Sequence, residues 1–261
     1  MSPANKTVTL VREDGAGLIR LSRDRGNAID DDVLDGLIQA AGEAGEDPGI
    51  EGVILTASGK LFCPGLDLVY LSAMDRPELG RFMEKFAACL LRLYRFPKPM
   101  VAALSGHTLA GGAVLSLAAD WRILQTGAMI GLNELKVGVP LPFGVSMILR
   151  DAVISPRLEE VALFGRNYKD EDALASGLAH EICPAGQLMA LAAERLREMT
   201  SRDLNSFAVT KRYLRSATVE RIEAREAEFH HQFLDCWFSP GTQKRIGQLV
   251  DQLTGRRGAD A

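Results

Sequence analysis

Residues 99–119 read PMVAALSGHTLAGGAVLSLAA and carry no charged side chain. By length alone this run could cross a membrane, since a spanning helix needs about 20 apolar residues. Its content predicts otherwise, because Pro99, Ser105 and several glycines interrupt it. We therefore expect a buried strand over 100–104, a turn, and a buried helix that begins at Gly111-Gly112 and ends at Asp120.

Strands and helices alternate on both sides of this run. Two short apolar segments around Asp14-Gly15-Ala16-Gly17 predict a hairpin. The further predicted elements are a helix from Asp30–Asp32 to Asp47, a strand over 52–56, a loop over 58–65, a helix over 77–94 and a strand over 121–124. Apolar strands between amphipathic helices indicate an α/β class in which helices cover a sheet.

The sequence beyond Pro156 is mostly helical in pattern and suggests a separate layer. The predicted helices cover 157–164, 187–199, 203–216, 220–237 and 242–253. The charged segment 220–228 is typical of a solvated helix face. The aromatic residues Phe229, Phe233, Trp237 and Phe238 follow it, and we expect this part of the tail to pack against another subunit.

Composition excludes several kinds of protein. With 30 basic and 34 acidic residues the formal charge is -4, without the basic excess of a nucleic-acid-binding protein. The four cysteines form no CxxC pair, and the four histidines lack metal-ligand spacing, so we expect no metal site. Residues 1–9 resemble neither a signal peptide nor an organelle presequence, which favours the cytoplasm.

Two glycine-containing loops each lead into a predicted helix, at Gly65 and at Gly111. The first N–H groups of a helix have no partner within it, so two such helix starts could each direct a donor at one substrate oxygen. The alternative is that the glycines only allow tight packing between segments.

Glu134 is the only acidic residue between Asp120 and Asp151. Apolar loop residues around it would desolvate the carboxylate and raise its pKa toward that of a general base. The alternative is an exposed glutamate paired with Lys136. For His107, within the uncharged run, a hydrogen-bonded structural role is favoured over catalysis.

Taken together, three segments resemble the crotonase (enoyl-CoA hydratase/isomerase) superfamily, over nearly the whole chain. Residues 23–29, RDRGNAI, look like an early family segment; residues 62–68, FCPGLDL, look like its first oxyanion loop. Residues 105–120 look like its second, glycine-rich loop and helix. The resemblance implies a spiral of ββα units over 1–200 that contains the acyl-CoA site, and a helical oligomerisation region over 201–261 that builds a homotrimer or a dimer of trimers.

The resemblance also implies roles for individual residues. The amides of Leu66 and Gly111 would hold the thioester oxygen, and Glu134 would be the catalytic carboxylate. The implied CoA contacts, mainly through backbone groups, are Arg25, Asn27, Ala28, Cys63, Gly65, Asp67 and Leu68. No separate cofactor is expected, because CoA is part of the substrate.

The resemblance separates hydration from isomerisation at one position. Hydratases of the family place a glutamate where this chain has Val114, so one carboxylate of their pair is missing. Water addition needs both water activation and proton delivery, whereas one base can move a proton from C2 to C4. Residues 110–115, 120–124 and 130–134 look most like the Δ3,Δ2-enoyl-CoA isomerases of the dodecenoyl-CoA type, which act in fatty acid β-oxidation. One alternative is an enoyl-CoA hydratase, or another lyase or hydrolase of the family, that uses His107 or another group in place of the missing acid. The other alternative is a non-catalytic acyl-CoA-binding protein.

Overall fold

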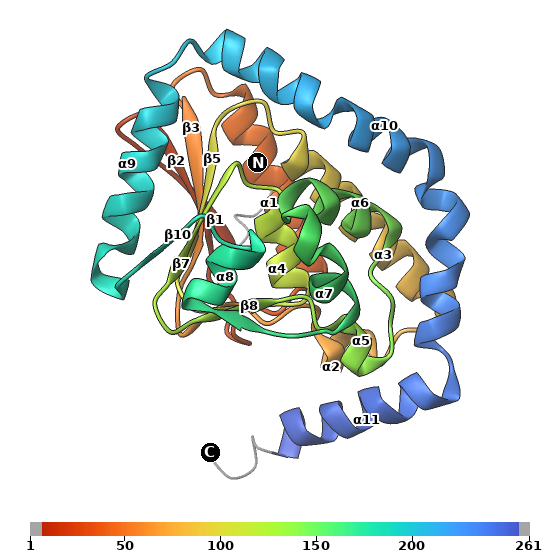
Figure 1. The fold of residues 1–261 in the computed structure, drawn as a ribbon. Coiled ribbons are helices and arrows are strands. Elements are labelled where there is room, and N and C mark those ends of the chain that lie inside the picture. Colours follow the sequence, from red (N-terminus) through yellow and green to blue (C-terminus); the bar gives the residue numbers. More distant parts are fainter. Residues whose placement is uncertain (1–6, 256–261) are drawn as a thin grey trace.

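The computed structural model describes residues 7–255, and its strands form two sheets (Figure 1). The larger sheet has six strands in the order β1-β2-β3-β5-β7-β10, and the smaller has four in the order β4-β6-β8-β9. The large sheet consists of β1 (Val8–Glu13), β2 (Ala16–Leu21), β3 (Gly52–Ala57), β5 (Met100–Leu104), β7 (Trp121–Gln125) and β10 (Glu181–Cys183). The small sheet consists of β4 (Leu61–Cys63), β6 (His107–Leu109), β8 (Met129–Gly131) and β9 (Tyr168–Lys169).

The same unit repeats along the chain and confirms the predicted spiral of ββα units. β3 lies in the large sheet and β4 in the small one, and the pairs β5/β6 and β7/β8 repeat this division. Each pair leads into helical structure, and β3, β5 and β7 run parallel to one another. The antiparallel hairpin β1-β2 begins the large sheet, as its turn residues predict.

Both faces of the large sheet are buried, which explains its nearly continuous apolar strands. Along β5, Met100, Ala102 and Leu104 face the main core, whereas Val101 and Ala103 face a second cluster. The uncharged run 99–119 therefore contains a doubly buried strand and a buried helix, as its composition predicts. Where a turn was expected between them, the chain also forms the short strand β6.

The second cluster is covered by a single helix, α9 (Leu188–Thr200). This helix supplies Leu188, Ala192 and Leu196, which are all buried against the sheet. The small side chain of Ala192, in the middle of this apolar stripe, lets α9 lie close to the strands.

The helices on the other side of the large sheet enclose the main core (Figure 1). They are α1 (Asp31–Glu46), α2 (Leu68–Leu71), α3 (Arg76–Tyr94), α4 (Gly111–Leu117), α5 (Glu134–Val137), α6 (Phe143–Ala152), α7 (Leu158–Leu163) and α8 (Asp170–Ser176), with 3-10 turns at Ser155–Arg157 and Ala185–Gln187. Side chains cap several of them: the Asp30 carboxylate accepts from Val33 N at 3.0 Å, and Asp75 and Glu78 form a capping box on α3.

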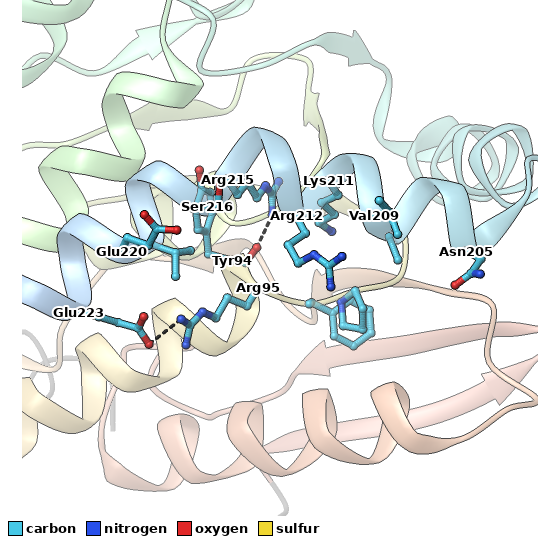
Figure 2. Close-up of a pocket in the computed structure, with 14 residues that line it drawn as sticks. Tyr94, Arg95, Asn205, Val209, Lys211, Arg212, Arg215, Ser216, Glu220 and Glu223 are labelled. Atoms are coloured by element: carbon cyan, nitrogen blue, oxygen red, sulfur yellow. Dashed lines mark hydrogen bonds and ion pairs between the residues drawn. The ribbon is translucent and has the colours of Figure 1, made fainter.

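The C-terminal part consists of α10 (Leu204–Trp237) and α11 (Pro240–Gly255). The prediction of two helices over 203–216 and 220–237 is wrong, because α10 is one continuous helix of 34 residues. Val219 and Ile222, next to the expected break, are buried, and this packing holds the helix together there. Arg215 Nη1 donates to Tyr94 O at 2.5 Å, and Arg95 pairs with Glu223 at the same distance (Figure 2).

Both ends of the chain lie partly outside the described residues. The prediction that residues 1–9 form no signal peptide or presequence concerns mostly such residues, as does the end of the predicted oligomerisation region 201–261. The loop predicted over 58–65 contains β4, and the strands β6, β8, β9 and β10 were also not predicted. Although α10 is long, no helix within residues 7–255 combines the length and apolar character needed to cross a membrane.

Candidate functional site

A cavity of about 140 Å³ lies where the two glycine loops meet the segment that begins α5. Its walls come from α2, α3, α4, α5 and α10 and from the loops between them. The lining residues are Pro64, Leu66, Leu68, Met83, Phe86, Ala110, Gly111, Val114, Asn133, Glu134, Val137, Val139, Pro142, Phe233 and Trp237. The structure thus brings together the three predicted catalytic positions, Leu66, Gly111 and Glu134, in one mostly apolar cavity.

The Leu66 amide is left free by the backbone pairing on either side of it. Ile29 N donates to Gly65 O at 2.8 Å, and Asp67 N donates to Ile29 O at 2.9 Å. Because successive amides of an extended segment point in opposite directions, the Leu66 N–H points away from Ile29. It donates to no acceptor within residues 7–255.

The Gly111 amide is free for a different reason, since Gly111 is the first residue of α4. Like Leu66 N, it donates to no acceptor in the described part of the chain. A Cβ atom placed on Gly65 would lie 3.2 Å from the Gly111 nitrogen, and one placed on Gly111 would lie 3.5 Å from the Leu66 nitrogen. The two free donors are therefore neighbours, as an oxyanion hole requires.

Close packing between the two loops brings these amides together. A Cβ atom on Gly112 would lie 2.2 Å from the Cys63 carbonyl oxygen, so only glycine fits there. Ala110, just before α4, has φ +45°, an uncommon conformation for a residue with a side chain. The two interpretations of the glycines are therefore compatible, because Gly112 packs tightly next to the free amide of Gly111.

Glu134 has a buried carboxylate rather than an exposed, paired one. Its Oε2 atom is buried and has no hydrogen-bond partner among the described residues. Burial raises the pKa of Glu134 to about 7. The alternative of an ion pair with Lys136 is wrong, because the Lys136 side chain is exposed and forms no ion pair in the described structure. A carboxyl group with this pKa can accept and return a proton near neutral pH.

The C-terminal helix α11 holds the end of the short helix that Glu134 begins. Arg245 Nε donates to Val137 O at 2.9 Å, and the Thr242 hydroxyl donates to Gly138 O at 3.0 Å. Gly138 ends α5 with φ +103°, and a Cβ atom there would lie 2.6 Å from Thr242 Oγ1. No local sequence pattern indicates these two contacts, because they join residues about 100 positions apart.

The predicted CoA-binding residues lie beside the cavity, and Leu68 alone among them lines it. The backbone of Asn27 has φ +66°, and its side-chain amide donates to Ser58 O and Leu61 O. Asp67 caps α2 and accepts from Arg23 Nη2 at 2.8 Å, with Arg25 at 3.4 Å. These side chains order the loops, which leaves mainly backbone atoms of the segment to meet a ligand.

The remaining predicted CoA contacts follow the same pattern. Ala28 and Cys63 are buried, and Gly65 adopts φ +110° against Ala110. The half-exposed Arg25 is the cation of this segment that solvent reaches most readily.

His107 has a structural contact and lies outside the cavity. Its Nδ1 accepts a hydrogen bond from Met129 N at 3.0 Å, which joins β6 to the start of β8. It does not line the cavity around Glu134. This position supports the structural role over a catalytic one.

Two aromatic residues of the tail belong to this site. The expectation that the tail aromatic residues pack against another subunit is wrong for Phe233 and Trp237, which are buried in their own chain and line the cavity. Phe229 stacks on Phe143 of α6, with 4.7 Å between ring centroids. Their spacing resembles that of any amphipathic helix, so the sequence could not show which surface they cover. The charged segment 220–228 is mostly exposed as predicted, except that half-buried Glu226 accepts from Gly144 N.

A second, larger cavity of about 610 Å³ lies between α10 and the end of α3 (Figure 2). Two cations that line it already have partners. Lys211 Nζ donates to Asp120 Oδ2 at 2.7 Å, and Arg215 donates to the other oxygen at 2.9 Å. Because Asp120 already engages both of these cations, whereas a carboxylate oxygen of Glu134 has no partner among the described residues, we place the chemistry at the smaller cavity. Within residues 7–255, no three His, Cys, Asp or Glu side chains converge as a metal site would require.

Known proteins resemble this chain in sequence and in fold. A sequence profile described as Enoyl-CoA hydratase/isomerase matches residues 12–245. A Thermus thermophilus protein provisionally named enoyl-CoA hydratase is 34% identical over 196 residues, 73% of this chain and 76% of that protein. A Mycobacterium bovis protein with a similar provisional name is 28% identical over 256 residues, 96% of this chain and 99% of that protein. Human mitochondrial delta3-delta2-enoyl-CoA isomerase has a TM-score of 0.92, covering 96% of this chain and 99% of its own; at 23% identity this likeness concerns the fold.

Proposed function

The chain belongs to the enoyl-CoA hydratase/isomerase family, and we propose that it is an isomerase that converts 3-enoyl-CoA to 2-enoyl-CoA. The observation that carries this proposal is the composition of the cavity around Glu134. Among the described residues that line it, Glu134 alone has a titratable side chain, and Val114 stands where hydratases of the family carry a second glutamate.

The proposed reaction uses one base and two amide donors. The Glu134 carboxylate takes a proton from C2, and the electrons of the C2–H bond move into the thioester to give an enolate. The Leu66 and Gly111 N–H groups stabilise the negative charge on the thioester oxygen. The same carboxyl group then returns the proton to C4, and the double bond moves from C3–C4 to C2–C3. No proton is gained or lost overall, so one carboxylate is enough.

The pKa of Glu134 suits this exchange. A carboxyl group with an ordinary pKa would be a weak base toward carbon, whereas burial raises the pKa of Glu134 to about 7. The apolar residues around it, such as Val137 and Val139, also exclude the water that a hydratase would need.

Hydration is the second candidate, because the provisional names of the sequence relatives refer to hydratases. Against it stands the single carboxylate, since water addition needs a group to activate water and a group to protonate the neighbouring carbon. The fold of the human isomerase matches 96% of this chain, but a fold does not decide between the two reactions.

Two assays on the same protein separate these candidates. Isomerisation of 3-hexenoyl-CoA produces a conjugated enoyl thioester, whereas hydration of crotonyl-CoA consumes one. We expect the first rate to exceed the second by at least 100-fold, and Val114→Glu to raise hydration, with Val114→Gln as the uncharged control. Equal rates in the unmodified protein would contradict isomerisation as the main activity, and acyl-CoA binding without either reaction would favour a non-catalytic protein.

The proposal also includes the pathway, the compartment, the CoA contacts and the oligomeric state. The protein acts on acyl-CoA thioesters in fatty acid β-oxidation, needs no separate cofactor, and works in the cytoplasm. Residues 25–28 and 63–68 hold the CoA moiety. Residues 201–261 support a homotrimer or a dimer of trimers.

A further inference from the structure

One wall of the cavity consists of large side chains from α3 and α10. Met83 and Phe86 come from α3, and Phe233 and Trp237 come from α10. All four are at most 5% exposed, and the rings of Phe233 and Trp237 lie 6.1 Å apart. This wall is therefore part of the packed core and not a mobile surface loop.

Little free space lies behind this wall. Phe86 and Pro142 also line a neighbouring cavity of only about 10 Å³, which is enclosed by Leu90, Ile148 and Ile222 among others. The backbone of Trp237 is held at the α10–α11 turn by Gln243, whose Nε2 donates to Trp237 O at 2.7 Å. An acyl chain that reached the wall could continue only by displacing core side chains.

The volume of the cavity limits the length of the acyl chain that it can hold. The cavity measures about 140 Å³. An apolar protein cavity of about 150 Å³ is known to hold one benzene molecule, which has six carbon atoms. Since Leu66, Gly111 and Glu134 line the same cavity, these six carbon atoms include the reacting ones.

We propose that Met83, Phe86, Phe233 and Trp237 close the acyl pocket and restrict the substrate to short acyl chains of about six carbon atoms. This inference rests on the proposed function for its reaction. The pocket itself can be tested without turnover. Helix α10 thus determines specificity through residues that lie about 100 positions after Glu134.

The first test is a chain-length series on the full-length protein. We expect kcat/KM for 3-hexenoyl-CoA to exceed that for 3-decenoyl-CoA by at least tenfold. Met83→Ala and Phe233→Ala, which enlarge the pocket, should reduce this ratio at least fivefold by accelerating the longer substrate. Met147→Ala is the matched control, because Met147 packs against the core without lining the cavity. Equal use of both substrates, or ratios unchanged in both enlarged variants, would overturn the proposal.

A binding measurement distinguishes failure of the pocket from failure of the isomerase assignment. By calorimetry, hexanoyl-CoA should bind the unmodified protein at least tenfold more tightly than decanoyl-CoA. A longer apolar chain would otherwise bind more tightly, because it buries more apolar surface. If no 3-enoyl-CoA is isomerised but this preference is observed, the proposed reaction fails and the closed pocket stands. If decanoyl-CoA binds equally well or better, the closed pocket is refuted.

Discussion

The hydroxyl of Thr242 donates a hydrogen bond to the carbonyl of Gly138, with 3.0 Å between the two oxygens. Gly138 ends the four-residue helix that begins with Glu134, so α11 holds the proposed base in place from the C-terminal end of the chain. A helix this short has almost no stability of its own and depends on such contacts.

Removal of this hydrogen bond should reduce turnover more than binding. Thr242→Val keeps the shape of the buried side chain but leaves Gly138 O without its donor. We expect kcat to fall about three- to tenfold, equivalent to about 1 kcal/mol, with KM changed less than about twofold. Steady-state kinetics with 3-hexenoyl-CoA measures both. Thr254→Val, which removes an exposed hydroxyl on the same helix, should change neither; equal losses in both variants would refute the positioning role.

Gly112 should tolerate no side chain. An alanine Cβ there would lie 2.2 Å from the Cys63 carbonyl oxygen, so the two loops that carry the oxyanion amides would have to separate. We expect Gly112→Ala to lower the free energy of unfolding by about 3 kcal/mol, the upper part of the range for overpacked cores. Gly247→Ala, in open space on α11, should instead be neutral or stabilising by up to about 1 kcal/mol. Denaturant unfolding compares the two, and an unaffected Gly112→Ala protein would contradict the close approach.

Buried Glu134 should make the folded protein less stable as the pH rises. Its pKa is about 7 in the folded state and near 4.5 when unfolded, so both states are protonated below pH 4. Between pH 4.5 and 7 the unfolded state loses its proton first, and stability is lost. Glu134→Gln should therefore match the unmodified protein near pH 4 and exceed it by about 3 kcal/mol above pH 7.5. A difference that does not change with pH would show that the carboxyl group is not buried.

The same pKa predicts how activity depends on pH. Only the carboxylate form can accept the C2 proton, so kcat/KM for 3-hexenoyl-CoA should fall about tenfold per pH unit below pH 7. The apparent pKa of the free enzyme should be about 7. A profile that stays flat down to pH 5 would indicate an ordinary carboxyl group at this position.

The sequence contained most of what was needed to predict the core. In β3 and β5 every residue is apolar or small, because both faces of the large sheet are covered, and this pattern is visible in the sequence. The three segments with Leu66, Gly111 and Glu134 were also predictable, and the structure places all three at one cavity. Strands such as β4 and β9 were not, since two or three residues are too few for a periodic pattern.

Other features depend on contacts between distant parts of the chain. The cavity around Glu134 is closed partly by α10, and the end of α5 is held by α11, but neither Phe233 nor Thr242 belongs to a recognisable motif. Likewise α10 continues through 217–219 because Val219 and Ile222 pack on the core, although the local sequence favours a break. Local patterns specify which residues are apolar, whereas the partner of each apolar surface is decided by the tertiary fold.

The most direct test of the proposed reaction is the activity of Glu134→Gln on 3-hexenoyl-CoA, measured together with its affinity for hexanoyl-CoA. Glutamine keeps the size and polarity of the side chain but cannot accept the proton from C2. We predict that kcat falls at least 1,000-fold, equivalent to about 4 kcal/mol, while the Kd of hexanoyl-CoA changes less than about threefold. Turnover retained within tenfold of the unmodified protein would contradict Glu134 as the base and, with it, the single-carboxylate isomerase.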